Sequence, residues 1–337
     1  MIALFSRVTP LVLGLAFAAA LPAIAQSNRT KAPSTKPDSI MNMSDSAAIA
    51  SIVAAERAFR ADVAAHGVRD GFIRHFAADG VLFRPGPVNA LEFLRAQQAQ
   101  PGLLEWEPAF AAVATSNDLG FTTGPWTYRP GEADSVVAAG HYATVWRRDA
   151  DGVWRAVIDH GVGLGRPMPV PEPQTVATPA QVVISSVTVD LPPGTASIEL
   201  ESEGRDERAS LQDELRRLDR DLSIAAGRVE GVTRFLGSVS DDARFLRQGR
   251  LPISGRSSVE ALLMTNPGGV TYAPAGVGVS NYQDFAYTWG GYWPGIGDDG
   301  APHGPETGNY IHVWRNETAG WRLVFEVLSP HPPVRKD

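Results

Sequence analysis

Hydrophobic and polar residues alternate over residues 140–161, a stretch that reads GHYATVWRRDADGVWRAVIDHG. Alternation with a period of two is typical of β-strands, and Asp-Gly between two such runs is a strong hairpin signal. A related stretch, GNYIHVWRNETAGWRLVFEVL, occupies residues 308–328. Both contain Tyr-x-x-Val-Trp-Arg, a polar turn, a glycine and Trp-Arg. The pattern predicts two similar hairpins, one at the end of each of two domains.

The segments before the first hairpin predict helices followed by strands. Apolar residues near helical spacing predict a helix from about Asp45 to His66 and a short helix over Asp70–Ala77. Residues 89–92, Asn-Ala-Leu-Glu, have the form of a capping box that begins a third helix. Strands are predicted over residues 81–83, 103–115, 119–129, 135–148 and 153–163. Helices followed by a meander predict an α+β domain over residues 45–165, with the helices on one sheet face.

The same order of motifs returns in the second half of the chain. Leucines at positions 211, 215, 218 and 222 predict a helix, and Ala243–Leu246 corresponds to the strand near Val81. A second capping box occupies Ser257–Glu260, before a further apolar run. Shared motifs in the same order across about 110 residues indicate an internal duplication. We therefore expect a second domain over residues 205–330.

The remaining segments are expected to lie outside the two folds. Residues 1–25 carry Arg7, an apolar run over Val8–Ala20 and an Ala-x-Ala site, which is typical of a signal peptide cleaved after Ala25. Residues 26–44 have a disordered composition, and residues 166–204 begin as a Pro-rich linker with a candidate hairpin over residues 182–201. Residues 331–337 form a tail. The signal predicts a periplasmic or secreted protein without membrane contact after cleavage.

Composition narrows the chemistry that the chain is expected to perform. With 44% hydrophobic and 20% charged residues it is an ordinary globular sequence, and its net charge of −7 without a basic run argues against a nucleic-acid partner. The sequence has no cysteine, which excludes disulfides and a thiol nucleophile. It also lacks a phosphate-binding glycine loop, a G-x-S-x-G elbow and a zinc motif. No cofactor and no metal is therefore expected.

The order of helix, helix, strand, helix and meander, ending in G-x-Y-x-x-V-W-R and G-x-W-R, resembles the nuclear-transport-factor-2-like (NTF2-like) superfamily, and within it the SnoaL-like domains. The resemblance covers residues 46–165 and 205–330. It implies two tandem cone-shaped domains, each with helices packed in a curved antiparallel sheet around an apolar pocket. The superfamily includes ketosteroid isomerase, dehydratases, polyketide cyclases and many non-catalytic binders, so the fold does not settle function.

The phase of the first hairpin predicts which side chains face the pocket. A turn centred on residues 150 and 151 places His141 opposite His160. The equivalent face of the second hairpin is the more apolar one, so this face is expected to line the cone. His141 and His160 are then candidate catalytic acid–base groups. A hydrogen-bonded pair without a catalytic role and a metal site are the alternatives. Asp159 is expected to leave on the opposite face.

Aromatic residues of the first repeat are candidates for ligand binding, with packing of the sheet as the alternative: Trp106, Phe121, Trp126, Tyr128 and Trp154. Trp146 and Trp314 are expected on outer faces, where an intramolecular pseudo-dimer of the two domains would bury both. Three functions remain open. The chain binds a small apolar or amphipathic molecule in the domain 1 pocket; it is an isomerase, cyclase or dehydratase that uses His141 and His160; or it is a scaffold with filled cones.

Overall fold

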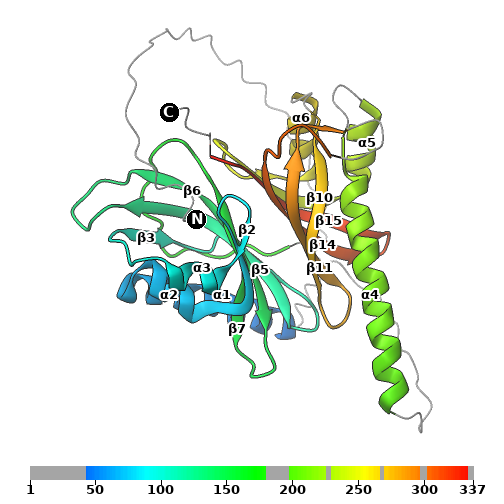
Figure 1. Cartoon of the computed structure of the whole chain (residues 1–337), viewed down its shortest axis with the longest axis horizontal. Coiled ribbons are helices and arrows are strands. Elements are labelled where there is room, and N and C mark those ends of the chain that lie inside the picture. The colour runs from blue at the N-terminus through cyan, green and yellow to red at the C-terminus, as the bar shows by residue number, and fades with distance from the viewer. Residues whose placement is uncertain (1–42, 180–196, 225–228, 266–268, 297–301, 333–337) are drawn as a thin grey trace, which may run out of the picture.

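The computed structural model describes residues 43–179, 197–224, 229–265, 269–296 and 302–332, which form two domains (Figure 1). The predicted signal peptide, nearly all of the segment before residue 45, the first strand of the candidate hairpin and most of the tail lie outside these residues. Among the described helices, none combines the length and the apolar character needed to cross a membrane.

Domain 1 contains three helices and seven strands. They are α1 (Met43–His66), α2 (Val68–His75), β1 (Phe76–Phe83), β2 (Pro87–Asn89), α3 (Ala90–Ala96), β3 (Leu103–Trp106), β4 (Phe110–Val113), β5 (Leu119–Arg129), β6 (Ala138–Arg148) and β7 (Trp154–Gly163). The Asn89 side chain accepts a hydrogen bond from the Glu92 backbone N–H at 3.0 Å, so the predicted capping box is confirmed. The single strand predicted over residues 103–115 is instead two, β3 and β4.

Domain 2 repeats this order with a few differences. It comprises α4 (Ser197–Asp221), α5 (Val229–Gly237), β8 (Val239–Arg247), β9 (Ile253–Ser254), α6 (Arg256–Thr265), β10 (Thr271–Val279), β11 (Phe285–Trp293), β12 (Gly295–Ile296), β13 (Pro302–His303), β14 (Gly308–Glu317) and β15 (Gly320–Pro330). Its helices are slightly longer, the single strand β10 stands in place of β3 and β4, and β12 and β13 are two additional short strands. The prediction of the second hairpin strand is wrong from Ser197 on, because α4 begins at that residue. Because α6 begins at Arg256, Ser257 does not cap it.

The two large sheets have the same connectivity. Their strand orders are β2-β1-β7-β6-β5-β3, with β4 also paired to β5, and β10-β11-β14-β15-β8-β9. The β1–β7 and β8–β15 pairs are parallel, and the other pairs of both sheets are antiparallel. The duplicated α+β fold class is therefore confirmed, with one parallel pair in each sheet.

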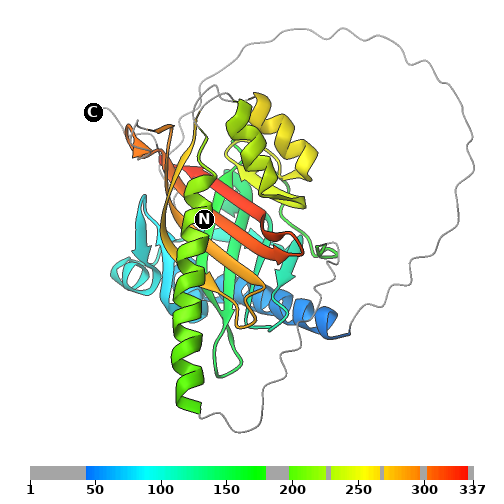
Figure 2. The same cartoon turned by 90° about the vertical axis from the view of Figure 1, so that its right-hand side faces the viewer.

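Each sheet is covered on both faces, which gives four layers: helices, sheet, sheet and helices (Figures 1 and 2). One face of the first sheet packs on α1–α3, and one face of the second packs on α4–α6. In Figure 2, α4 crosses the strands of the second sheet. The other two faces share one hydrophobic cluster, which includes Phe121 and Val145 of domain 1 and Ile311 and Phe325 of domain 2. We call the two sides of each sheet its helix-facing side and its domain-facing side.

The loops before β5 and β11 join the two domains by reciprocal hydrogen bonds. The Thr115 backbone N–H donates to Asp284 Oδ2 at 2.7 Å, and the Asn281 backbone N–H donates to Asp118 Oδ2 at 3.0 Å. Asp118 and Asp284 both directly precede their strands. The contact therefore has approximate two-fold symmetry, as a duplicated chain allows.

Part of the Pro-rich linker packs against domain 1. Ala177 forms a parallel bridge with Phe110. The Ala177 N–H donates to the Ala109 carbonyl at 2.9 Å, and the Ala111 N–H donates to the Ala177 carbonyl at 3.0 Å. The linker thus extends the sheet beside β4 before it leaves the described residues.

The register of the first hairpin differs from the predicted one. His141 pairs with Val162 and His160 with Ala143, so the prediction that the two histidines lie opposite each other is wrong. Val157 is an extra residue where the register shifts, a β-bulge that reverses the alternation along β7. A single alternating pattern therefore does not give the faces of all β7 residues, because the pattern is reversed after the bulge.

Candidate functional site

The helix-facing side of the first sheet holds a buried carboxylate from α1. Glu56 accepts hydrogen bonds from Trp106 Nε1 at 2.5 Å, from Trp146 Nε1 at 2.9 Å and from Thr122 Oγ1. Burial raises the pKa of Glu56 to about 7, although the hydrogen bonds from Thr122, Trp106 and Trp146 oppose this change. These hydrogen bonds link α1 to three strands of the sheet.

Glu56→Gln is expected to destabilise domain 1 by about 1–3 kcal/mol, because the amide NH2 group, unlike either oxygen of the carboxyl group, cannot accept the hydrogen bonds that Trp106, Thr122 and Trp146 donate. The raised pKa also predicts the direction in which the stability of domain 1 changes with pH. Stability from Glu56 is complete below pH 4.5, the ordinary pKa, and is lost as the pH rises through about 7. Urea denaturation between these pH values measures both effects, with the exposed Glu92→Gln as control. Equal losses in the two variants would contradict the assignment.

The equivalent carboxylate of domain 2 is Asp219 of α4. It accepts from Thr288 Oγ1 at 2.9 Å and from the Tyr310 hydroxyl at 2.6 Å, and its Oδ1 lies 2.7 Å from His312 Nδ1. Trp314 Nε1 donates to Thr288 Oγ1 at 3.0 Å, as Trp146 does to Thr122 at 3.1 Å. The duplication thus preserves a helix carboxylate, a threonine and a tryptophan.

In domain 2 this arrangement extends into a closed polar network. His312 Nε2 lies 2.7 Å from Glu326 Oε2, which also accepts from the Tyr272 hydroxyl at 2.8 Å. Arg247 Nη2 donates to Glu326 Oε1. Burial alone lowers the pKa of His312, but the Asp219 carboxylate and the hydrogen bonds raise it to about 9. Burial opposes ionisation of Glu326, yet Arg247 and His312 lower its pKa to about 2. The network therefore holds a protonated imidazole between two carboxylates.

Domain 1 carries different residues at the corresponding positions. The strand registers and the order along β1 and β8 align Tyr142, Thr144, Asp159 and Arg84 with Tyr310, His312, Glu326 and Arg247. Thr144 Oγ1 donates to Asp159 Oδ2 at 3.0 Å. A threonine is too short to bridge the helix carboxylate and the strand carboxylate as His312 does. The interior of domain 1 is therefore connected differently from that of domain 2.

Among the described residues, several buried donors of domain 1 have no direct hydrogen-bond partner: the Tyr142 hydroxyl, Trp126 Nε1, and Nε and Nη2 of Arg84. The Tyr142 hydroxyl has a weaker contact with Thr122, which only partly offsets the effect of burial on its pKa. Tyr142 is 0% and Trp126 1% exposed, and both belong to the helix-facing cluster. Burial raises the pKa of Tyr142 well above 10 and lowers that of Arg84 to about 10, so all three side chains are donors at neutral pH. An unpaired buried donor costs about 1–3 kcal/mol. Such a set is typical of a site that a ligand completes.

The structure separates the predicted ligand-binding residues. Trp106, Trp126 and Trp154 lie on the helix-facing side of the first sheet, and Tyr128 packs at the margin of the same cluster. The Tyr128 hydroxyl donates to the Pro101 carbonyl at 3.1 Å. Phe121 lies instead on the domain-facing side. Trp146 and Trp314, which were expected on outer faces, are both in the helix-facing clusters, so that prediction is wrong.

His141 and His160 lie on the domain-facing side, so their assignment to the cone is wrong. The His160 ring packs 4.7 Å from the Phe83 ring, and His141 lines a cavity between the domains. Burial lowers the pKa of His141 to about 4 and that of His160 well below 6.5, so both are neutral at neutral pH. Asp159 leaves on the opposite face, as predicted, where it accepts from Thr144. The choice of face failed because the second domain buries the more apolar side.

The carboxylates near β3 form ion pairs. Glu105 lies 2.8 Å from Arg129, and the buried Glu107 lies 2.6 Å from Arg57 and 2.7 Å from Arg60. Within the described ranges, no group of three or more histidine and acidic side chains is placed to hold a metal ion.

The sequence contains a signal for the helix carboxylates that the prediction missed. Glu56 lies four residues after Ile52 and three before Phe59, within the apolar stripe of α1. Asp219 has the same spacing from Leu215 and Leu222 in α4. A carboxylate within an apolar helical stripe faces the interior, where it needs hydrogen-bond donors.

No protein-family model and no curated protein matches the sequence. Solved structures do match, each over about one domain. An NTF2-like protein with a cystatin-like fold from Novosphingobium aromaticivorans is 16% identical, with 40% of this chain and 92% of that chain covered and a TM-score of 0.30. An NTF2-like protein of unknown function from Pseudomonas putida KT2440 is 17% identical, with 34% and 86% covered and a TM-score of 0.29.

A ketosteroid isomerase-like protein from Erwinia carotovora atroseptica is 14% identical, with 38% of this chain and 94% of that chain covered and a TM-score of 0.24. At these identities the likeness concerns the fold alone, and the chemistry of the chain has to be inferred from its own residues.

Proposed function

We propose that domain 1 is an exported binding domain whose interior holds a small amphipathic molecule with oxygen acceptors. One observation carries this proposal. At equivalent positions, Tyr310 and Arg247 of domain 2 bond to carboxylates of their own domain, whereas the Tyr142 hydroxyl and two nitrogens of Arg84 have no direct partner among the described residues. Trp126 Nε1, also in the interior of domain 1, has none there either. Domain 2 then serves as the structural half of an intramolecular pseudo-dimer.

The residues of domain 1 fit a ligand with an apolar body and a polar end. Trp106, Trp126 and Trp154 supply aromatic surface, which packs well against flat or aliphatic molecules. Arg84 is only half-buried and lies at the end of β1, with its guanidinium 5.5 Å from the Phe93 ring. A charged or strongly polar end of the ligand therefore belongs near Arg84, and its apolar part near the tryptophans.

The positions of the histidines weaken the isomerase, cyclase or dehydratase alternative. His141 and His160, its candidate acid–base groups, do not face the interior of domain 1. The scaffold alternative is supported for domain 2 alone, where His312 and its partners fill the interior.

Tyr142→Phe is expected to weaken ligand binding about tenfold, the effect of one lost hydrogen bond of about 1.4 kcal/mol. Its denaturation midpoint is expected to be unchanged or higher, because the hydroxyl that it removes has no direct hydrogen-bond partner among the described residues. A panel of amphipathic carboxylic acids, ketones and alcohols screened by tryptophan fluorescence identifies a ligand. Calorimetric titration then compares its affinity for the wild type and the variant.

Tyr310→Phe is the matched control. It removes a hydroxyl that donates to Asp219, so we expect it to destabilise the protein by about 1–3 kcal/mol and to leave ligand affinity unchanged. The proposal fails if no compound in the panel binds and Tyr142→Phe destabilises the protein as much as Tyr310→Phe does. That result would identify domain 1 as a filled scaffold.

A further inference from the structure

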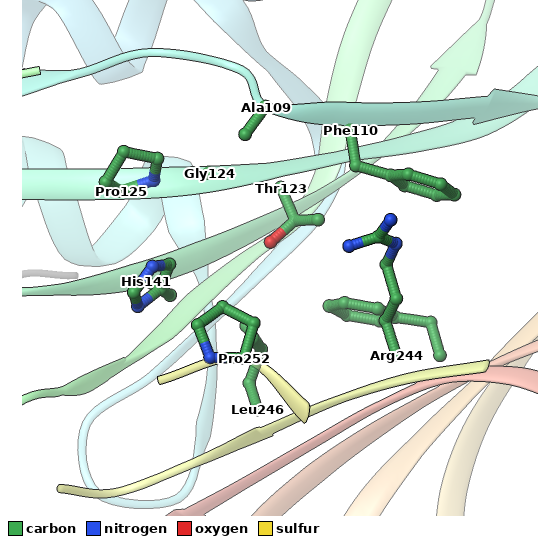
Figure 3. Close-up of a pocket in the computed structure, with 10 residues that line it drawn as sticks. Ala109, Phe110, Thr123, Gly124, Pro125, His141, Arg244, Leu246 and Pro252 are labelled. Carbon is green, nitrogen blue, oxygen red and sulfur yellow. The ribbon is translucent and has the colours of Figure 1, made fainter. Parts of the chain in front are cut away.

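The two domains form a partly open cavity of about 80 Å³ on one side of their contact (Figure 3). Domain 1 contributes β5, β6 and the start of β4, and domain 2 contributes β8, β15 and the loop before β9. The lining is largely apolar and consists of Ala109, Phe110, Thr123, Gly124, Pro125, His141, Arg244, Leu246, Pro252 and Phe325. The cavity lies on the domain-facing side of both sheets, so it is separate from the interior of domain 1.

Arg244 places a guanidinium in this cavity, and no carboxylate of the described residues pairs with it. The group lies 4.3 Å from the centre of the Phe110 ring, and Nη1 donates to Ser254 Oγ at 3.2 Å. Its Nε is buried and has no hydrogen-bond partner in the described part of the chain. The nearby carboxylate of Asp242 bonds instead to Arg315 and Ser240. A cation thus faces apolar walls with at least one donor free.

His141 supplies a second unpaired group. Its side chain is 7% exposed, and Nδ1 has no hydrogen-bond partner among the residues that the structure describes. Figure 3 shows His141 and the Arg244 guanidinium on either side of Thr123. Burial keeps the imidazole neutral at neutral pH, since the pKa of His141 is lowered to about 4. A neutral imidazole donates from one nitrogen, so Nδ1 can donate to a bound oxygen.

The approximate two-fold symmetry relates this cavity to a second position between the domains, and that position is filled by side chains. The registers align Thr123 with Trp289 and His141 with Asn309. Trp289 packs 5.9 Å from the Phe83 ring, and Asn309 Nδ2 donates to the Pro85 carbonyl. The cavity is therefore not a necessary result of packing two such sheets. It exists where a threonine replaces a tryptophan and a histidine is left without a partner.

We propose that this cavity binds a short aliphatic monocarboxylate. The carboxylate accepts from Arg244 Nε and His141 Nδ1, and the alkyl tail packs on Phe110, Leu246 and Phe325. Since one water needs roughly 10–15 Å³ of such volume, the cavity accommodates about six heavy atoms, the size of butyrate. A guanidinium recognises a carboxylate by charge and by paired hydrogen bonds, whereas an amide of the same shape lacks the charge.

The test uses the mature full-length chain and ¹³C-labelled butyrate, with binding followed by NMR line broadening. We expect saturable binding, and binding at least tenfold weaker for butyramide and for Arg244→Gln. Thr123→Trp, which copies the opposite side, is expected to abolish binding. His141→Asn keeps a small polar side chain at its position and is expected to weaken binding several-fold. Circular dichroism melting confirms that each variant is folded.

Butyramide binding as tight as that of butyrate, or unchanged affinity in folded Arg244→Gln and His141→Asn, would overturn the proposal. Tyr142→Phe provides the control inside domain 1, and we expect it to leave butyrate affinity unchanged. Because the two sites have separate variants, failure of this site and failure of the domain 1 site are distinguishable.

Discussion

Glu326→Gln is expected to destabilise domain 2 by about 3–5 kcal/mol, the usual cost of removing one member of a buried ion pair. Glu326 is fully buried and bonds to His312, Tyr272 and Arg247. The amide removes the negative charge that faces Arg247 and the protonated imidazole. It also directs two N–H groups at side chains that are already donors. The interior of domain 2 therefore keeps positive charge without compensation.

Glu317→Gln is the control for this experiment. Glu317 also pairs with an arginine, Arg315 at 2.6 Å, but its side chain is 20% exposed, whereas that of Glu326 is fully buried, and the pair belongs to a half-buried network with Asp242. We expect it to cost about 1–2 kcal/mol, less than Glu326→Gln, because water can partly replace the lost interactions of a half-buried carboxylate. Urea denaturation gives the free energies, and hydrogen exchange of β14 and β15 locates the loss. Similar costs for the two variants would show that Glu326 is not part of a charged network.

The same network predicts how the stability of domain 2 depends on pH. Folding raises the pKa of His312 from 6.5 to about 9, so its stabilisation is complete below pH 6.5 and is lost as the pH rises towards 9. Folding lowers the pKa of Glu326 from 4.5 to about 2, so its stabilisation is complete above pH 4.5 and is lost as the pH falls towards 2. We expect the contribution of these groups to be greatest between pH 4.5 and 6.5. Hydrogen exchange of β14, measured on both sides of this range from about pH 2 to 9, follows the acid and the alkaline loss, and His312→Leu is expected to remove the alkaline one.

Local features of this fold follow from the sequence because short-range physics determines them. Asn89 caps its helix by a bond three residues away, and the bounds of β5 agree with the alternation of its residues. The duplication was also visible in the order of motifs. What these features share is that each depends on neighbours in the chain, so a pattern of residue types is sufficient to detect them.

The faces of the hairpins were misassigned because two long-range facts override the pattern. The bulge at Val157 inserts a residue that no composition signal marks. The second sheet then buries Val145 and Ile158 as thoroughly as helices would, so an apolar face does not identify the cone. The true interior is partly polar, since His312 and Glu326 satisfy each other there. Taking the more apolar face as the one that lines the cone therefore selected the wrong face of each hairpin.

Phe325→Ala is expected to destabilise the protein by about 3–5 kcal/mol, the usual cost of truncating a buried phenylalanine. Phe325 is 0% exposed and lies between the sheets, with its ring centre 4.7 Å from that of Phe121. The loss therefore affects the contact between the domains as well as domain 2. We expect reduced hydrogen-exchange protection on β5, which belongs to the other domain.

A double-mutant cycle with Phe121→Ala tests whether the effect crosses between the domains. We expect a coupling energy of about 0.5–1.5 kcal/mol, as for other packed aromatic pairs. Phe245→Ala is the matched control, because Phe245 is equally buried but belongs to the helix-facing cluster of domain 2. It is expected to cost a similar amount and to add to Phe121→Ala without coupling. Additivity in both pairs would mean that the two sheets do not stabilise each other. Coupling only between Phe121 and Phe325 would show that the domain-facing sides form one core, which is the condition for a cavity between them to keep a fixed shape.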